Sequence, residues 1–206
     1  MRARTFVLGF LTIGCASTPA PHGTWSDRTL AASNGVLCNH RVPEAACVFH
    51  HPALAADFER SGDWCAEHAR PESQCLICHP DLSFDPLPKL PRDADVKWLA
   101  RAGEGVGPLE ALAVPGRVTV VDFYADWCAP CRKVDAFLFT RLSERRDVAV
   151  RKLNVVSWDT ALAKEHLSDV ASLPYLVVFS PAGRRVRAVK GFDLDALEAA
   201  LLEASR

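Results

Sequence analysis

The 206-residue sequence has no long apolar run and no excess of either charge. Its main apolar stretch, residues 6–13, is well short of the about 20 residues that span a bilayer. Lys and Arg number 24 against 25 Asp and Glu, which excludes the basic face typical of nucleic-acid-binding proteins. With 49% hydrophobic residues, a wholly disordered chain is excluded too. The chain has a single Met but eight Cys, so the placement of the cysteines carries most of the information about function.

The N-terminus has the layout of a secretory signal, with Arg2 and Arg4 before the apolar residues 6–13. The following Leu11-Thr-Ile-Gly-Cys15 resembles the lipobox of bacterial lipoproteins, although Thr stands where Leu is commonest. This resemblance implies a signal peptide over residues 1–14 and lipidation of Cys15. We therefore expect an exported, lipid-anchored protein of the bacterial cell envelope that faces the periplasm; an ordinary cleaved signal is the alternative.

Composition divides the rest of the chain into four parts. Residues 15–36 are rich in small and polar residues and are interpreted as a tether. Residues 37–82 form a small, irregular segment that holds five Cys and five His. The Pro-rich residues 83–95 are expected to form an extended linker. Residues 96–206 alternate between apolar runs and charged helical stretches, which indicates a globular domain.

The pattern in residues 96–206 predicts an α/β domain. Continuous apolar and β-branched runs are typical of strands buried on both faces. Such runs predict strands at 118–124, 149–154, 175–179 and 186–190. Helical spacing of apolar residues follows position 131 and recurs after Asp193, which is a suitable N-cap for a closing helix.

Cys128 and Cys131 lie where the strand at 118–124 gives way to a helix. The first thiol is then at a helix N-terminus, where unpaired N–H groups and the helix dipole favour the thiolate. Two intervening residues allow the second thiol to close a disulfide with it. The pattern predicts an attacking and a resolving thiol, with a structural disulfide or half of a zinc site as the alternatives. Asp122 is a second candidate, because a carboxylate in an apolar strand is costly to bury without a role.

The run Val121-Asp-Phe-Tyr-Ala-Asp-Trp-Cys-Ala-Pro-Cys-Arg-Lys133 resembles the active-site segment of the thioredoxin family, and the resemblance covers about residues 96–206. It implies a thioredoxin-like fold, in which helices flank a mixed central sheet, and a thiol–disulfide oxidoreductase activity that requires no cofactor. Cys128 is then the nucleophile and Cys131 the resolving thiol. The other residues that the resemblance places in the site are Asp122, Lys152 and a cis-Pro174, with Trp127, Leu173 and Gly191 along the substrate groove.

The same resemblance indicates partners and a direction. Ala129-Pro130 lacks the His found between the thiols of strongly oxidising relatives, so we expect a reductant or disulfide exchanger. The expected partners are client proteins with disulfides or cysteine metal sites, and a membrane thiol carrier as electron donor. The chain departs from the family with Tyr175 in place of Thr and Ala136 in place of a helix-kinking Pro.

Residues 37–82 contain an internal repeat. At an offset of 28 residues Cys47 matches Cys75, and His50 aligns with Cys78. A Cys-to-His exchange at a matched position suits tetrahedral coordination of Zn or Cu and does not suit a disulfide. The expected ligands are Cys38, His40, Cys47 and His50 in the first copy, and Cys65, His68, Cys75 and Cys78 in the second.

Two alternatives to metal binding stay open for the repeat. In an oxidising compartment its five Cys are also candidates for disulfides. Cys75-Leu-Ile-Cys78-His79 is a c-type haem attachment string; haem is disfavoured, because the first copy lacks the string and no Met remains as axial ligand after the signal is removed. The repeat also resembles Cys/His segments of heavy-metal efflux adaptor proteins. A metal-delivery protein in which Cys128 and Cys131 act as ligands is therefore the alternative to an enzyme.

Overall fold

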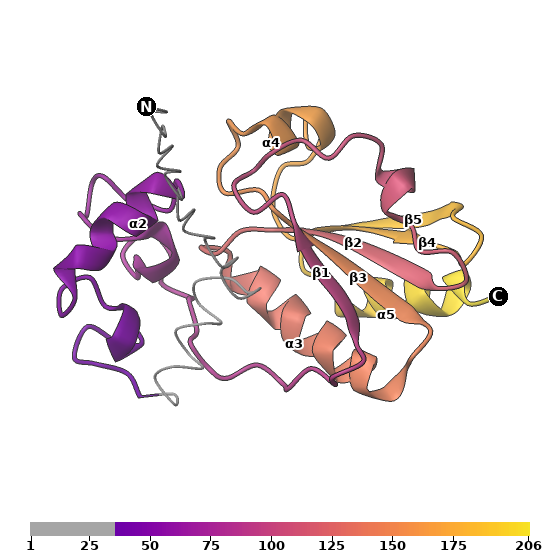
Figure 1. Ribbon diagram of the computed structural model, residues 1–206, viewed down its shortest axis with the longest axis horizontal. Helices are drawn as coiled ribbons and strands as arrows, with labels where there is room; N and C mark the ends of the chain where they lie inside the picture. Colours follow the sequence, from indigo (N-terminus) through magenta and orange to yellow (C-terminus); the bar gives the residue numbers. More distant parts are fainter. Residues whose placement is uncertain (1–35) are drawn as a thin grey trace, which may run out of the picture.

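The computed structural model describes residues 36–206. A small segment of short helices packs beside an α/β domain (Figure 1). The predicted signal peptide, the lipidation site Cys15 and nearly all of the tether lie outside the described residues. Within residues 36–206, no helix is both long enough and apolar enough to cross a membrane.

The Cys/His segment, residues 37–82, is built from turns and short helices. These are the 3₁₀ helices η1 (Glu44–Ala46), η2 (Pro52–Leu54) and η3 (Glu72–Gln74), and the α-helix α2 (Ala55–Arg60). Matched prolines of the repeat, Pro43 and Pro71, precede η1 and η3. Because proline fixes its own φ near −65°, the two copies begin their 3₁₀ helices in the same way.

The domain contains a five-stranded sheet in the order β1-β3-β2-β4-β5. Its strands are β1 (Asp95–Leu99), β2 (Val118–Tyr124), β3 (Val148–Asn154), β4 (Tyr175–Phe179) and β5 (Arg185–Lys190). β1 and β2 run parallel to β3, whereas β4 is antiparallel to β2 and β5. The predicted mixed sheet is therefore confirmed, and β1 is an additional edge strand that is not among the strands predicted from the sequence.

Helices cover both faces of this sheet (Figure 1). They are η4 (Leu109–Leu112), α3 (Ala129–Glu144), α4 (Ala161–His166) and α5 (Leu194–Ala204). The apolar stripes of α3 and α5 bury Leu138 and Leu201 against one face, and α4 buries Leu162 against the other. Each fully buried leucine contributes about 1.5–3 kcal/mol relative to an exposed one. The two hydrophobic layers between the sheet and its helices therefore hold the sheet and the start of α3 in place.

The Pro-rich linker packs against the domain along much of its length. Leu87 and Leu90 lie on the core layer under α3. Arg132 on α3 donates a hydrogen bond of 2.6 Å from Nη2 to the carbonyl oxygen of Asp85. In Figure 1 the linker runs alongside α3. These contacts hold the Cys/His segment next to the N-terminus of that helix.

Candidate active site and metal centres

Cys128 is the N-cap of α3. Its sulfur accepts a hydrogen bond of 3.2 Å from the backbone N–H of Cys131, in the place where a capping oxygen usually accepts. Pro130 lies in the first turn, where a missing N–H breaks no helical hydrogen bond. The two sulfurs are joined in a disulfide. Cys128 is 5% exposed and Cys131 1%, so the first thiol is the more accessible of the pair.

The Leu173–Pro174 peptide bond beside the disulfide is cis. The carbonyl oxygen of Pro174 accepts a hydrogen bond of 2.9 Å from the N–H of Gly191. Gly191 has φ of +73°, a conformation that glycine adopts without steric cost. Leu173, Trp127 and Cys128 line a cleft of about 260 Å³. Two of the predicted groove residues thus form its wall, while Gly191 supports the wall from the neighbouring strand end.

Three charged side chains meet beneath the start of α3. Asp122 and Lys152 are register partners on β2 and β3, and side chains alternate along a strand, so both point to the α3 face. Their side chains are fully buried, with Lys152 Nζ 3.0 Å from Asp122 Oδ2. Lys152 also donates a hydrogen bond to Asp135 on α3. Burial alone lowers the pKa of Lys152, but Asp122 and then Asp135 outweigh it and hold that pKa above its ordinary value.

Asp135 is not among the site residues predicted from the sequence, although its position in the helix gives a signal. Cys131, Val134 and Leu138 define the buried face of α3, and position 135 falls on the same face at the spacing of one turn. A pocket of about 20 Å³, room for about one water, is lined by Cys131, Asp135 and Ser73. The resolving cysteine and this acid therefore border one small pocket.

The first metal group consists of Cys38, His40, Cys47 and His50, whose ligand atoms all lie within 4.8 Å of one another. His40 Nδ1 is 3.8 Å from Cys38 Sγ and 3.4 Å from Cys47 Sγ. Cys38 and His40 are half-buried, Cys47 is buried and His50 is exposed. The structure thus brings together the four residues predicted from the first copy of the repeat.

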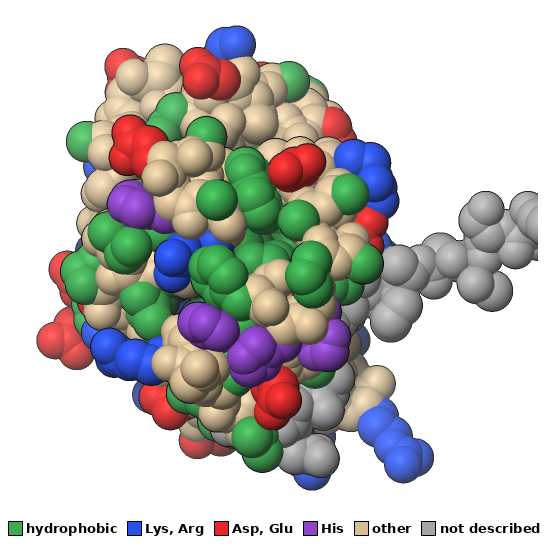
Figure 2. All heavy atoms as spheres, turned by 90° about the vertical axis from the view of Figure 1, so that its left-hand side faces the viewer, with side chains coloured by type: hydrophobic (Ala, Val, Ile, Leu, Met, Phe, Trp, Pro, Cys, Tyr) green, Lys and Arg blue, Asp and Glu red, His purple; other side chains and the backbone are tan. Residues whose placement is uncertain are grey.

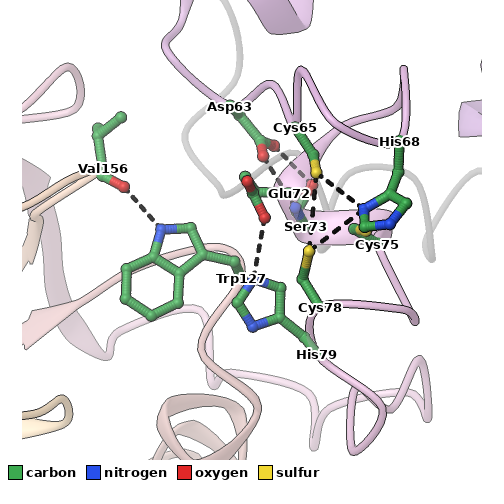
Figure 3. Close-up of polar contacts among 10 residues, drawn as sticks. All are labelled: Asp63, Cys65, His68, Glu72, Ser73, Cys75, Cys78, His79, Trp127 and Val156. Atoms are coloured by element: carbon green, nitrogen blue, oxygen red, sulfur yellow. Dashed lines mark hydrogen bonds and ion pairs between the residues drawn. The ribbon is translucent and has the colours of Figure 1, made fainter.

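The second metal group consists of Cys65, His68, Cys75 and Cys78 (Figure 3). His68 Nδ1 lies 3.3, 3.5 and 3.4 Å from the sulfurs of Cys65, Cys75 and Cys78, and the sulfurs of Cys65 and Cys78 are 3.7 Å apart. In a tetrahedron with Zn–S of about 2.3 Å and Zn–N of about 2.0–2.1 Å, the S···N edges are about 3.5 Å and the S···S edges about 3.8 Å. The observed spacings are close to these values.

The thiols of the segment are free and not joined to one another. Without a cation, burial raises the pKa of the Cys65 thiol, and the neighbouring Cys75 raises the pKa of Cys78 to about 12. A metal ion reverses this preference, because thiols bind metals as thiolates. Asp63 braces the second group by accepting hydrogen bonds of 2.8 and 2.5 Å from the backbone N–H and hydroxyl of Ser73 (Figure 3).

His79 connects the second metal group to the redox site. Its ring stacks on Trp127 with the ring centroids 5.5 Å apart and the planes 19° from parallel. Nε2 of His79 lies 3.0 Å from Oε2 of Glu72, and the indole N–H of Trp127 donates to the carbonyl of Val156 at 2.6 Å (Figure 3). In the sequence, His79 matches His51 of the first copy of the repeat and completes the haem attachment string. Its contact with Trp127 depends on the packing of the two modules, which no local pattern shows.

A family model described as Thioredoxin matches residues 110–203, a range that includes both active-site cysteines and excludes the Cys/His segment. The chain is 34% identical over 100 residues to the mitochondrial thioredoxin-2 of Schizosaccharomyces pombe, covering 48% of this chain and 72% of that protein. It is 32% identical over 91 residues to thioredoxin-2 of Saccharomyces cerevisiae, covering 44% of this chain and 84% of that protein.

A third relative is larger. The chain is 35% identical over 77 residues to the thiol:disulfide interchange protein DsbD of Tatumella citrea, covering 34% of this chain and 13% of that protein. Among solved structures, the reduced thioredoxin pre-protein of Schistosoma mansoni is 25% identical with a TM-score of 0.41, covering 54% of this chain and 100% of that one.

Proposed function

Because this chain belongs to the thioredoxin family, we propose that it reduces or exchanges disulfides of client proteins with the thiols of Cys128 and Cys131. One observation carries this proposal. Cys128 caps the first turn of α3 beside an open cleft, and Cys131, one turn further along the helix, forms a disulfide with Cys128. A thiolate at that place is stabilised by the helix N-terminus.

The reaction is a pair of thiol–disulfide exchanges. The Cys128 thiolate attacks one sulfur of the client disulfide, forms a mixed disulfide and releases the other client sulfur, which takes up a proton. The Cys131 thiolate then attacks Cys128 Sγ and releases the second client sulfur as a thiolate, which also takes up a proton. Two electrons pass from the cysteine pair to the client, and the Cys128–Cys131 disulfide remains. We assign to Asp122, buried with Lys152, the proton that Cys131 gives up.

The cycle needs a dithiol donor to reduce the Cys128–Cys131 disulfide again. We propose a membrane thiol carrier as this donor, with the enzyme lipid-anchored through Cys15 and facing the periplasm. The lipobox-like residues 11–15 support the anchor. The similarity to a thiol:disulfide interchange protein supports exchange with another thiol pair. The absence of a His between the two cysteines supports a reducing or exchanging direction.

The test is insulin reduction with dithiothreitol as electron source. The wild type is expected to turn over, and Cys128→Ser to be inactive. Cys131→Ser is expected to accumulate a mixed disulfide between Cys128 and the insulin chain, visible by intact mass spectrometry. Turnover in the Cys128→Ser variant, or the lack of a trapped species in Cys131→Ser, would contradict the proposal. No turnover in the wild type would favour the alternative in which the two thiols only bind metal.

We also propose that each copy of the repeat binds one ion of the zinc or copper type. The supporting observation is the set of spacings in the second metal group, which fit a tetrahedral ion. Elemental analysis of the full chain is expected to give two ions per molecule, and His40→Ala or His68→Ala to give one. A Soret band with a covalent gain in mass would support c-type haem instead, and intramolecular disulfides among the five cysteines would also contradict metal binding.

A further inference from the structure

The cleft beside Cys128 is built from two separate parts of the chain. The domain supplies apolar walls from Trp127, Trp158 and Leu173, and the Cys/His segment supplies His79 and Asp81. At about 260 Å³ the cleft is slightly smaller than pockets for drug-sized ligands, which start at about 300 Å³. It is suited to one or two side chains of a peptide that lies across it.

His79 is fixed in this wall from both sides. Its ring rests on Trp127, and its Nε2 is paired with Glu72 at the start of η3. On the chain it directly follows Cys78, a member of the second metal group. An ion bound there fixes the backbone from which His79 projects. The peptide bond between Cys78 and His79 thus links metal binding at the second group to the position of the cleft wall.

The lining indicates which peptides fit. Trp158 is 41% exposed although it is a large aromatic residue, and exposed aromatics of this kind serve as anchors for binding partners. On the face that carries the Cys/His segment, His side chains lie next to hydrophobic ones (Figure 2). Asp81 adds a carboxylate to the rim, which repels acidic side chains. The cleft therefore favours an apolar side chain next to the client cystine.

We propose that the second metal group contributes to the client-binding cleft: its ion holds His79 on Trp127, where the His79 ring completes the wall that favours peptide disulfides with an apolar neighbouring residue. The proposal rests on the oxidoreductase function above and names the part of that site that the thioredoxin-like domain does not supply. No ligand of either metal group lines the cleft itself, but the second group adjoins it through His79, whereas no residue of the first copy of the repeat lines it.

The test compares His79→Ala with His51→Ala in the full, zinc-loaded chain. His51 is the matched position of the first copy; it is exposed, and its N–H bonds the carbonyl of Cys47 as that of His79 bonds Cys75. The substrates are two peptide disulfides that differ in Leu or Glu beside the cystine, and hydroxyethyl disulfide. For His79→Ala we expect kcat/KM on the Leu peptide to fall about five- to tenfold, mainly through KM, as for loss of one central contact. Hydroxyethyl disulfide, which has no neighbouring residue, is expected to lose clearly less than the Leu peptide, and His51→Ala is expected to behave as the wild type on all three substrates.

A metal-depleted variant tests the link to the ion. Cys78→Ser is expected to lose the second ion and to show the same loss on the Leu peptide as His79→Ala. The double variant is expected to lose no more than either single one, because both changes remove one shared effect. An unchanged Leu-to-Glu ratio in His79→Ala, an equal loss on all three substrates, or additive losses in the double variant would overturn the proposal. Failure of the proposed function is distinct: the wild type would then reduce none of the three disulfides.

Discussion

Position 152 holds a fully buried lysine between two buried acids. Lys152 contacts Asp122 and Asp135, and none of the three side chains is more than slightly exposed. Removing one member of such a buried group leaves uncompensated charge, which is far more costly than the loss of a surface pair. The arrangement beneath the thiols therefore couples the redox site to the stability of the whole domain.

Lys152→Met is expected to lower the free energy of unfolding at pH 7 by about 3–5 kcal/mol, because it leaves two carboxylates facing each other inside the protein. Asp135→Asn keeps the Lys152–Asp122 pair and is expected to cost less. Urea denaturation of both variants measures this. Equal losses, or no loss in Lys152→Met, would contradict the assignment.

The same group predicts how stability depends on alkaline pH. The pKa of Lys152 in the folded protein lies above its ordinary value of 10.5, so folding favours the protonated form. The stabilisation is complete below pH 10.5 and is lost as the pH rises toward the folded-state pKa. We therefore expect the difference in stability between the wild type and Lys152→Met to shrink as the pH rises above about 10.5. A difference in stability that grows above pH 10.5 would contradict this prediction, because it would mean that folding lowers the pKa of Lys152.

At this scale the sequence predicted residues whose roles are local or shared with a family. The eight candidate metal ligands follow from the repeat, and Cys128, Cys131 and Asp122 follow from one strand and the helix after it. Asp135 and His79 were not predicted because their partners lie on other parts of the fold: Lys152 is on β3 and not on α3, and Trp127 is in the other module. Such contacts arise from tertiary packing, which periodicity does not encode.

Among the elements, α5 offers a clean separation of stability from chemistry. Asp193 caps it by accepting a hydrogen bond of 2.8 Å from the N–H of Ala196, as the sequence predicted. Asp193→Ala is expected to lower stability by about 1 kcal/mol, with insulin reduction unchanged. The exposed Asp195→Ala in the same turn removes only a favourable interaction with the helix dipole and is expected to cost a few tenths of a kcal/mol. Thermal and urea denaturation measure both; an equal effect of the two variants would argue against the cap.

The hydrophobic pattern of the sequence does not predict the edge strand β1. β1 is an edge strand whose residues are half-buried or exposed, so it has no continuous apolar run like that of β2. Nη1 of Arg151 on β3 lies 2.8 Å from Oδ1 of Asp95 on β1, and this pairing lowers the pKa of the Asp95 carboxyl. Pairing with β3 and the packing of half-buried Val96, Trp98 and Leu99 on the two core layers keep β1 in the sheet.

On the scale of the whole molecule, the two modules differ in how they are held together. The domain has a hydrophobic layer on each face of its sheet. The cluster that the Cys/His segment contributes to is small, with Val42, Cys47 and Phe84 as its buried members. A small module with so little buried apolar surface usually needs metal or disulfides to fold. Since its thiols are free in the structure, bound ions are the expected source of its stability.

This difference predicts two thermal transitions in the metal-loaded protein. Chelation is expected to lower the transition of the segment by about 10 °C or more, since 1 kcal/mol shifts the Tm of a small domain by about 4–8 °C and bound metal contributes several kcal/mol. The domain transition should move by less than about 2 °C, a small effect on the same scale. Calorimetry with and without chelator measures both, and a variant with Cys128→Ser and Cys131→Ser serves as control, because its segment should respond to chelation as the wild type does. A single transition that shifts as one unit would show instead that the two modules fold together, with the contact of His79 and Trp127 as part of a common core.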